Sequence, residues 1–156
     1  MNLINTTITQ RIQESIAVKQ VLLKDQVLLG QITQLAEDCI NALRQGGKVI
    51  FAGNGGSFAD AEHLSAEFTS RFLFDRAPLP SLALGTNNSA LSAIGNDYGF
   101  EQVFARELRG IAQPNDVFIG ISTSGNSPNI LAAIQVVKEM SLRQIAWTGQ
   151  TGGKLA

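Results

Sequence analysis

The chain has 156 residues, 44% of them hydrophobic and 16% charged, which is the size and composition of one domain with a substantial core. Twelve Lys and Arg against 13 Asp and Glu leave a net charge of -1, which argues against nucleic acid as a partner. The N-terminus lacks a secretory signal pattern and no apolar run approaches about 18 residues, so we expect a cytoplasmic protein that does not enter a membrane. The single cysteine, Cys39, excludes an internal disulfide and is predicted to be a buried structural thiol.

The first 45 residues are predicted to be helical. Apolar residues recur there every three or four positions, as Ile8, Ile12 and Ile16 illustrate. Gly46 and Gly47 supply the left-handed backbone that commonly ends a helix.

The remainder of the chain alternates short apolar runs with helical patterns. Strands are expected at 48–52, 81–84, 117–121 and 144–147, and helices at 58–71, 89–94, 100–112 and 129–140. Strands joined by helices lie parallel, so we predict a doubly wound α/β sandwich of the flavodoxin-like or Rossmann-like kind. No linker interrupts the pattern, so the chain is predicted to be a single domain over 1–156, with a helical region at 1–45 and an α/β core at 46–156.

Two similar loops follow the first and third expected strands, in KVIFAGNGGSFAD and VFIGISTSGNSPN. The first loop contains Gly53, Asn54, Gly55, Gly56 and Ser57, and the second contains Ser122, Thr123, Ser124, Gly125, Asn126 and Ser127. Ligands of parallel sheets bind where such loops and helix N-termini meet, and neutral donors suit a phosphate monoester. The alternative is that each loop is only a turn and a helix cap. The spacing excludes a Walker loop and disfavours a dinucleotide fingerprint.

The helix after the first loop carries the only histidine of the chain. His63 and Glu67 are four residues apart and Asp60 is three before His63, so all three share one helix face. Such a pair could bind Zn²⁺, or Glu67 could act as a general base, or the residues could form an ordinary exposed pair. A catalytic zinc site needs about three protein ligands, so these two residues are not sufficient by themselves.

Other polar and aromatic residues have two interpretations each. Asn96 and Asp97 could bind sugar hydroxyls or cap the helix that begins near Phe100. Arg71 and Arg76 could reach a phosphate across a subunit interface, although surface charge is the simpler interpretation. A further group is interpreted as core or subunit contact: Phe68, Phe72, Phe74, Leu79 and Leu82.

Four ordered motifs, AGNGGSFADAEHLSAEF, AIGNDYGF, GISTSGNSPNIL and TGQTGGKLA, closely resemble the sugar isomerase (SIS) domain of bacterial phosphoheptose isomerases. The resemblance covers about 30–156 and implies a homotetramer with active sites at subunit interfaces. It also implies interconversion of sedoheptulose 7-phosphate and D-glycero-D-manno-heptose 7-phosphate through an enediol, which feeds heptose into surface glycans such as lipopolysaccharide. No organic cofactor is implied.

The resemblance also assigns roles by motif. Asn54, Gly55 and Gly56 would contact the substrate together with Asn96 and Asp97, and Ser122, Thr123, Ser124 and Ser127 would bind the phosphate. His63 and Glu67 match zinc ligands, and Glu67 matches the catalytic base.

One departure from the family lies at the end of the sequence. Family members continue past GGKLA with a strand and a helix that carry a Gln and a His of the zinc site, and the sequence stops at Ala156. We therefore expect a fragment, or otherwise a shortened relative with impaired catalysis. The competing function is a SIS module without catalysis that binds a phosphosugar or a replication initiator. Glu67 favours the enzyme, because the binding relatives lack it.

Overall fold

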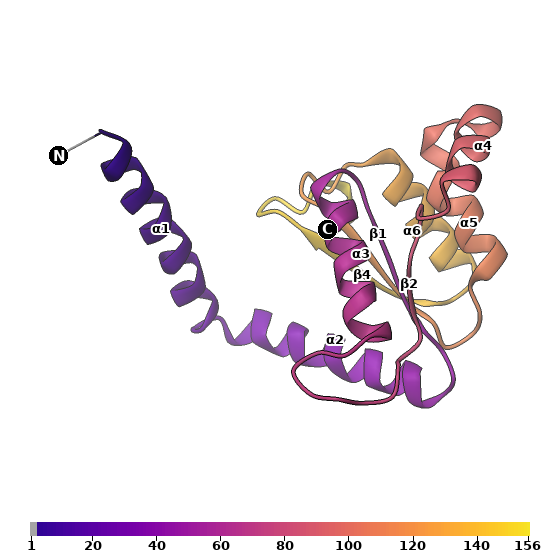
Figure 1. Cartoon of the computed structure of the whole chain (residues 1–156), viewed down its shortest axis with the longest axis horizontal. Helices are drawn as coiled ribbons and strands as arrows, with labels where there is room; N and C mark the ends of the chain where they lie inside the picture. The colour runs from indigo at the N-terminus through magenta and orange to yellow at the C-terminus, as the bar shows by residue number, and fades with distance from the viewer. Residues whose placement is uncertain (1–2) are drawn as a thin grey trace. The chain divides into compact units, whose positions relative to one another are not determined.

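The computed structural model describes residues 3–156 (Figure 1). Its helices are α1 (Leu3–Leu22), α2 (Gln26–Arg44), α3 (Gly56–Thr69), α4 (Asn88–Tyr98), α5 (Val103–Ile111) and α6 (Pro128–Glu139), with short 3-10 turns η1 (Phe100–Gln102) and η2 (Gly153–Leu155). Its strands are β1 (Val49–Gly53), β2 (Ser81–Ala83), β3 (Val117–Ser122) and β4 (Arg143–Thr148). The chain separates into two compact units, Met1–Glu37 and Asp38–Ala156.

The first unit consists of α1 and the beginning of α2, as the helical periodicity predicts. The two helices are interrupted near Asp25, whose carboxylate accepts the backbone N–H of Leu28 at 3.0 Å and so caps α2. None of the described residues of α1 is buried, and Ile8, Ile12 and Ile16 form an exposed row. Within residues 3–156 no helix has the length and apolar character needed to cross a bilayer.

The second unit contains a four-stranded parallel sheet in the order β2-β1-β3-β4. Val49 pairs with Ser81 on one side and with Val117 on the other, so β1 lies inside the sheet. The predicted doubly wound parallel fold is confirmed, and each strand begins and ends within one residue of its expected position.

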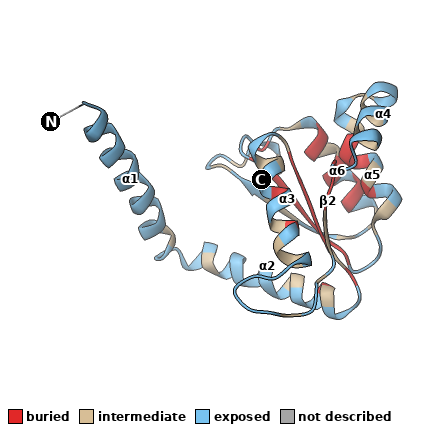
Figure 2. Cartoon of the chain, viewed as in Figure 1, coloured by how far each residue is buried: buried red, intermediate tan, exposed pale blue. Residues whose placement is uncertain are grey.

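The core lies on both faces of the sheet, since β1 and β3 are buried throughout (Figure 2). On one face Ile50 and Phe118 join a cluster with Phe104 of α5 and Ile130 of α6. On the other face Phe51 packs against Phe68 of α3, with ring centroids 6.0 Å apart. Alternate residues of β1 therefore serve opposite layers, which is the pattern of a sheet covered on two sides.

A buried ion pair joins the amino ends of β1 and β3. Asp116 is 2% exposed, and its carboxylate accepts the backbone N–H and the ammonium of Lys48 at 2.9 and 2.6 Å. It also accepts the backbone N–H of Gln113 at 2.8 Å. Three donors thus compensate this carboxylate for the loss of water.

Cys39 differs from its prediction, because it is only half-buried on α2. Burial raises the pKa of its thiol, and the neighbouring carboxylate of Asp38 raises it further. A raised pKa keeps the thiol protonated, and therefore weakly nucleophilic, at neutral pH.

Candidate functional site

The two predicted loops lie at the topological switch point of the sheet. The chain leaves β1 toward β2 and leaves β3 toward β4, in opposite directions, and the carboxyl ends of strands at such a point are where parallel sheets bind ligands. Gly53 and Ile121 are paired at these ends, and Asn54 and Ser122 follow directly. The fold therefore places the two loops side by side.

The first loop depends on two glycines. A Cβ on Gly53 would overlap the backbone carbonyl of Ser57, so the absent side chain allows α3 to begin immediately beside β1. Gly55 has φ 55° and ψ -120°, a conformation that residues with a side chain rarely adopt. The turn is closed by the Ser57 N–H, which donates to the carbonyl of Asn54 at 3.0 Å.

The second loop exposes some of its hydroxyls and buries others. Ser122 is 3% exposed, and its Oγ lies 2.8 Å from Oγ of Ser127. Thr123 and Ser124 are exposed, and Oγ of Ser124 also accepts the backbone N–H of Asn126 at 3.1 Å. The loop therefore has two solvent-exposed hydroxyls, those of Thr123 and Ser124, beside the hydrogen-bonded pair of Ser122 and Ser127.

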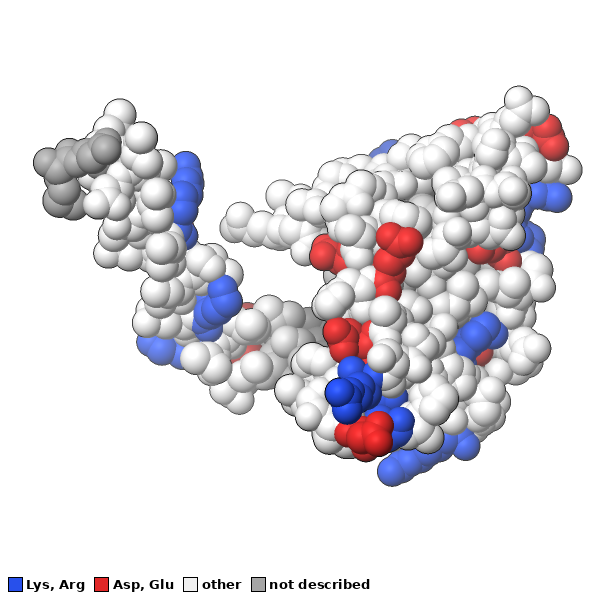
Figure 3. Space-filling view, in the orientation of Figure 1, with Lys and Arg blue, Asp and Glu red and all other residues white. Residues whose placement is uncertain are grey.

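Both loops lead into helices with open N-termini. Among the described residues, no side chain caps the first turn of α3 or α6, whereas Asn87 caps α4 by accepting the N–H of Ala90 at 3.1 Å. Uncapped N–H groups and the positive end of the helix dipole attract an anion. The loops at 53–57 and 122–127 contain no Lys or Arg, and charges of both signs are interspersed on the face shown in Figure 3. An anion at these loops would therefore meet neutral donors.

An amide pair connects the first loop to the start of α6. Nδ2 of Asn54 donates to Oδ1 of Asn129 at 2.9 Å, and Nδ2 of Asn129 donates to Oδ1 of Asn54 at 2.8 Å. Asn129 is 2% exposed and Asn54 is half-buried. Sequence reasoning missed Asn129, although an amide buried in the first turn of a helix beside a polar loop is an available signal.

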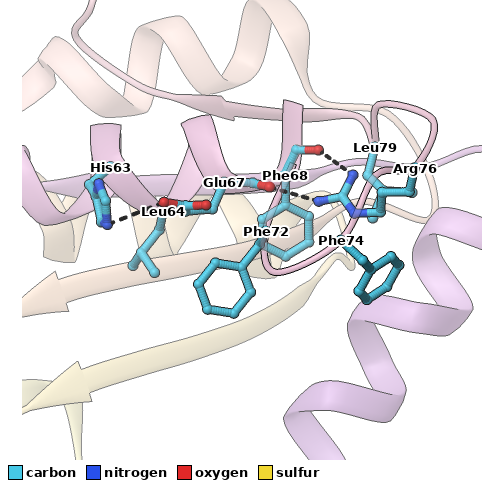
Figure 4. Close-up of a pocket in the computed structure, with 8 residues that line it drawn as sticks. All are labelled: His63, Leu64, Glu67, Phe68, Phe72, Phe74, Arg76 and Leu79. Carbon is cyan, nitrogen blue, oxygen red and sulfur yellow. Dashed lines mark hydrogen bonds and ion pairs between the residues drawn. The ribbon is translucent and has the colours of Figure 1, made fainter. Parts of the chain in front are cut away.

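His63 and Glu67 lie together on α3. Nε2 of His63 is 3.5 Å from Oε1 of Glu67, and their side chains are 73% and 33% exposed (Figure 4). They border a hollow of about 460 Å³ whose other walls are mainly apolar: Leu64, Phe68, Phe72, Phe74 and Leu79. Asp60 is exposed on the same helix, and within residues 3–156 no three His, Cys, Asp or Glu side chains gather closely enough to hold a metal.

Arg76 supports the end of α3 that carries Glu67. Its guanidinium donates to the backbone carbonyls of Glu67 and Phe68 at 2.7 and 2.9 Å (Figure 4). The carbonyls of a last helical turn lack helical partners and carry the negative end of the dipole, so a cation stabilises them. Arg76 is thus a helix-terminating residue in this chain, whereas Arg71 is exposed.

Asn96 and Asp97 lie on α4 and form no hydrogen bond with either loop among the described residues. Both belong to the last turns of α4, where Nδ2 of Asn96 donates to Oδ1 of Asp97 at 2.8 Å. They line a polar hollow with Asn88, Ser89 and Ser92, and within the described residues no hydrogen bond joins them to either loop. Their alternative role as a cap is wrong, because α4 continues to Tyr98 and Gly99 separates it from the next helix.

Comparisons with known proteins agree with this architecture. The model of the SIS domain family matches residues 13–149. A phosphoheptose isomerase of Aneurinibacillus thermoaerophilus is 52% identical over 97% of this chain and 77% of its own length, and one from Burkholderia pseudomallei is 49% identical over 96% and 76%. The phosphoheptose isomerase structure from Neisseria gonorrhoeae superposes with a TM-score of 0.89 at 41% identity, covering 97% of this chain and 78% of that one.

The chain belongs to the phosphoheptose isomerase family of SIS-domain proteins. The match at 13–149 includes both loops and the His63 and Glu67 pair, so the resemblance read from the motifs is confirmed at the level of family and fold.

Glu107 is a further polar residue of this SIS domain that sequence reasoning missed. It lies on α5, and its carboxylate accepts the backbone N–H of Gly85 at 2.7 Å, in the loop that follows β2. Burial raises the pKa of the Glu107 carboxyl, and the hydrogen bond from Gly85 opposes that rise. A lone acidic residue next to the buried Leu108 was the available signal.

Replacement of Glu107 should change how the stability of this SIS domain depends on pH. Because the pKa of the carboxyl is raised in the folded protein, the protonated carboxyl adds to the free energy of unfolding. This contribution is complete below pH 4.5 and is lost as the pH rises through the raised pKa. Glu107→Gln keeps an acceptor for Gly85 and cannot ionise. We expect the variant to gain stability relative to wild type between pH 4.5 and pH 7, by less than about 1 kcal/mol because the group is half-exposed. Urea unfolding at both pH values measures this, and a constant difference would contradict it.

Proposed function

We propose that this chain interconverts sedoheptulose 7-phosphate and D-glycero-D-manno-heptose 7-phosphate through an enediol. The single observation that carries the proposal is the pair of neutral, Gly- and Ser-rich loops at the β1 and β3 switch point, the first of which leads into helix α3, where His63 and Glu67 lie. The names of the relatives support the substrate class.

We assign the phosphate to the second loop and the first turn of α6. Ser122, Thr123, Ser124 and Ser127 supply hydroxyls there, and the open helix N-terminus supplies N–H donors. Asn54, Gly55, Gly56 and Ser57 would contact the sugar, and Asn96 and Asp97 would reach it only from another part of an assembly, because no contact joins them to the loops among the described residues.

The distance along α3 suits an extended seven-carbon substrate. At 1.5 Å per residue, His63 lies about 10 Å beyond Gly56 along the helix axis. Side chains tilt toward the helix N-terminus, so the carboxylate of Glu67 reaches back to the level of His63. A phosphate at the loops would thus leave the far end of the sugar near these two residues.

Glu67 would transfer the proton. Ketose to aldose conversion moves a proton between adjacent carbons, which a single carboxylate can accept from one carbon and return to the other. Glu67 is two-thirds buried beside apolar walls, and the bonds of Arg76 to the end of α3 fix its backbone.

The donor set fits part of a zinc site. With Zn–N and Zn–O distances of about 2.0–2.1 Å, neighbouring ligands of a tetrahedral ion lie about 3.3 Å apart. The 3.5 Å between His63 and Glu67 matches one such edge, and we propose that these two residues hold Zn²⁺ with further ligands supplied from outside the described residues. Lewis-acid polarisation of the substrate carbonyl is the chemistry that zinc supplies when bound.

We also propose a homotetrameric, cytoplasmic enzyme that supplies heptose for surface glycans such as lipopolysaccharide. The exposed row of Ile4, Ile8, Ile12 and Ile16 on α1 supports association, since a helix with such a row is stabilised by packing against others.

Deuterium exchange tests the proposed reaction directly. The protein is incubated with sedoheptulose 7-phosphate and zinc in D₂O, and deuterium entry at C1 is followed by NMR. We expect exchange with the phosphorylated sugar and much slower exchange with sedoheptulose itself. Binding of the phosphorylated sugar without any exchange would reject the isomerase and favour the non-catalytic SIS module.

Ser124→Ala tests the phosphate assignment. Removing a hydroxyl that donates to a charged phosphate costs about 1.5–3 kcal/mol, or about 10-fold to 100-fold in the dissociation constant. We expect that loss for sedoheptulose 7-phosphate by calorimetry, and little change for the exposed control Ser15→Ala. An unaltered dissociation constant in Ser124→Ala would exclude this loop as the phosphate site.

A further inference from the structure

The amide pair of Asn54 and Asn129 is the only link by side-chain hydrogen bonds between the first loop and α6 among the described residues. It joins segments 75 residues apart in the sequence, at the carboxyl ends of the two central strands. Asn129 is 2% exposed, so neither its donor nor its acceptor can turn to bulk water. A buried amide is costly unless it is hydrogen-bonded, and here one specific partner satisfies it.

The pair leaves Asn54 able to bind a ligand. An amide has two N–H donors and two acceptor lone pairs, and the pair uses one of each from both residues. Asn54 is half-buried, and the pair leaves its second N–H and second lone pair uncommitted, while the orientation of its side chain is set by Asn129.

The position of Asn129 makes that orientation relevant to both loops. Asn129 is the second residue of α6, directly after Pro128 and the second loop. Because its backbone moves with the open N-terminus of α6, its bonds to Asn54 couple the first loop to the segment that we assign to the phosphate.

We propose that Asn129 is a positioning residue of the sugar-phosphate site, which sets the spacing between the sugar-binding first loop and the phosphate-binding second loop through Asn54. This inference rests on the proposed function for the identity of the ligand. Asn129 itself does not touch the ligand through its side chain, because the residue is only 2% exposed.

Two ligands and a double-mutant cycle test this role. Inorganic phosphate occupies only the second loop, whereas sedoheptulose 7-phosphate spans both. For Asn129→Ala we expect sedoheptulose 7-phosphate to bind at least about 10-fold more weakly and inorganic phosphate to change by less than about 3-fold. In the Asn54→Ala background, Asn129→Ala should add less than about 2-fold, because the residue through which it acts is gone.

The controls separate positioning from folding. Asn41→Ala, an exposed asparagine of α2, should leave both affinities unchanged. Asn129→Leu keeps the number and branching of the side-chain heavy atoms of asparagine without its hydrogen bonds, so it should reproduce the effect of Asn129→Ala and replaces it if that variant does not fold. An equal loss in the wild-type and Asn54→Ala backgrounds, or an equal loss for both ligands, would overturn the proposal.

Hydrogen exchange keeps the two conclusions distinguishable. If the wild type binds inorganic phosphate and no sedoheptulose 7-phosphate, the proposed substrate is wrong. The amides of residues 53–58 then decide the role of Asn129: faster exchange in Asn129→Ala, and not in Asn41→Ala, supports its positioning of the first loop, and unchanged exchange overturns it.

Discussion

Glu67→Gln should abolish measurable deuterium entry into sedoheptulose 7-phosphate while the sugar phosphate still binds. The amide has nearly the shape of the carboxylate but cannot accept a proton from carbon, and general-base catalysis contributes about 100-fold to 10,000-fold to the rate. The backbone bond from Arg76 to the Glu67 carbonyl does not involve the side chain, so α3 should remain intact. NMR in D₂O gives the exchange rate, and calorimetry gives the affinity.

The matched control is Glu62→Gln, which makes the same change at an exposed position of the same helix. It should exchange at the wild-type rate. Unchanged exchange in Glu67→Gln would refute Glu67 as the base. Lost binding together with lost exchange would assign Glu67 to binding instead of proton transfer.

Asp116→Ala should lower the free energy of unfolding by about 3–5 kcal/mol, the range expected when one partner of a buried ion pair is removed. The substitution strands the ammonium of Lys48, which is 21% exposed, and two backbone N–H groups that the carboxylate accepts. Urea denaturation followed by circular dichroism measures the change.

Asp75→Ala is the control for Asp116→Ala, because Asp75 is exposed, and its stability should stay within about 0.5 kcal/mol of wild type. Asp116→Asn should lose less than Asp116→Ala, since the amide oxygen still accepts one of the N–H groups. A loss below about 1 kcal/mol in Asp116→Ala would mean that water replaces the carboxylate at the amino ends of β1 and β3.

The order and type of the elements could be predicted because local patterns determine them. The residues at 117–121 form a short apolar run with β-branched and aromatic side chains, which is typical of a buried strand, and the GNGGS segment combines a close approach at Gly53 with a helix start. The end of α4 could not be predicted, since Gly95 and Asn96 are residue types that commonly end a helix, yet α4 continues through them to Tyr98.

For residues far apart in the sequence, only the proximity of whole segments could be predicted, and not which side chains bond each other. The strand order brings the two loops together, as the similarity of their sequences indicated. The pairing of Asn54 with Asn129, however, depends on the strand register and on the orientation of α6, which the spacing of residues in the sequence does not determine. The hydrogen bond that the Gly85 N–H donates to Glu107 could not be predicted for the same reason. His63 and Glu67 were easier to place, because residues four apart on a helix are always neighbours.

The place of β1 between β2 and β3 has a consequence for synthesis on the ribosome. Lys48 and Asp116, which directly precede β1 and its partner β3, are 68 residues apart. At about 5–20 residues per second, the ribosome therefore needs roughly 3–14 s after β1 to synthesise β3. During that interval Val49, Ile50 and Phe51, which end almost entirely buried, have only β2 as a strand neighbour within the chain described here. The nascent chain therefore carries an apolar strand with one unpaired edge, of the kind that chaperones bind and that aggregation exploits.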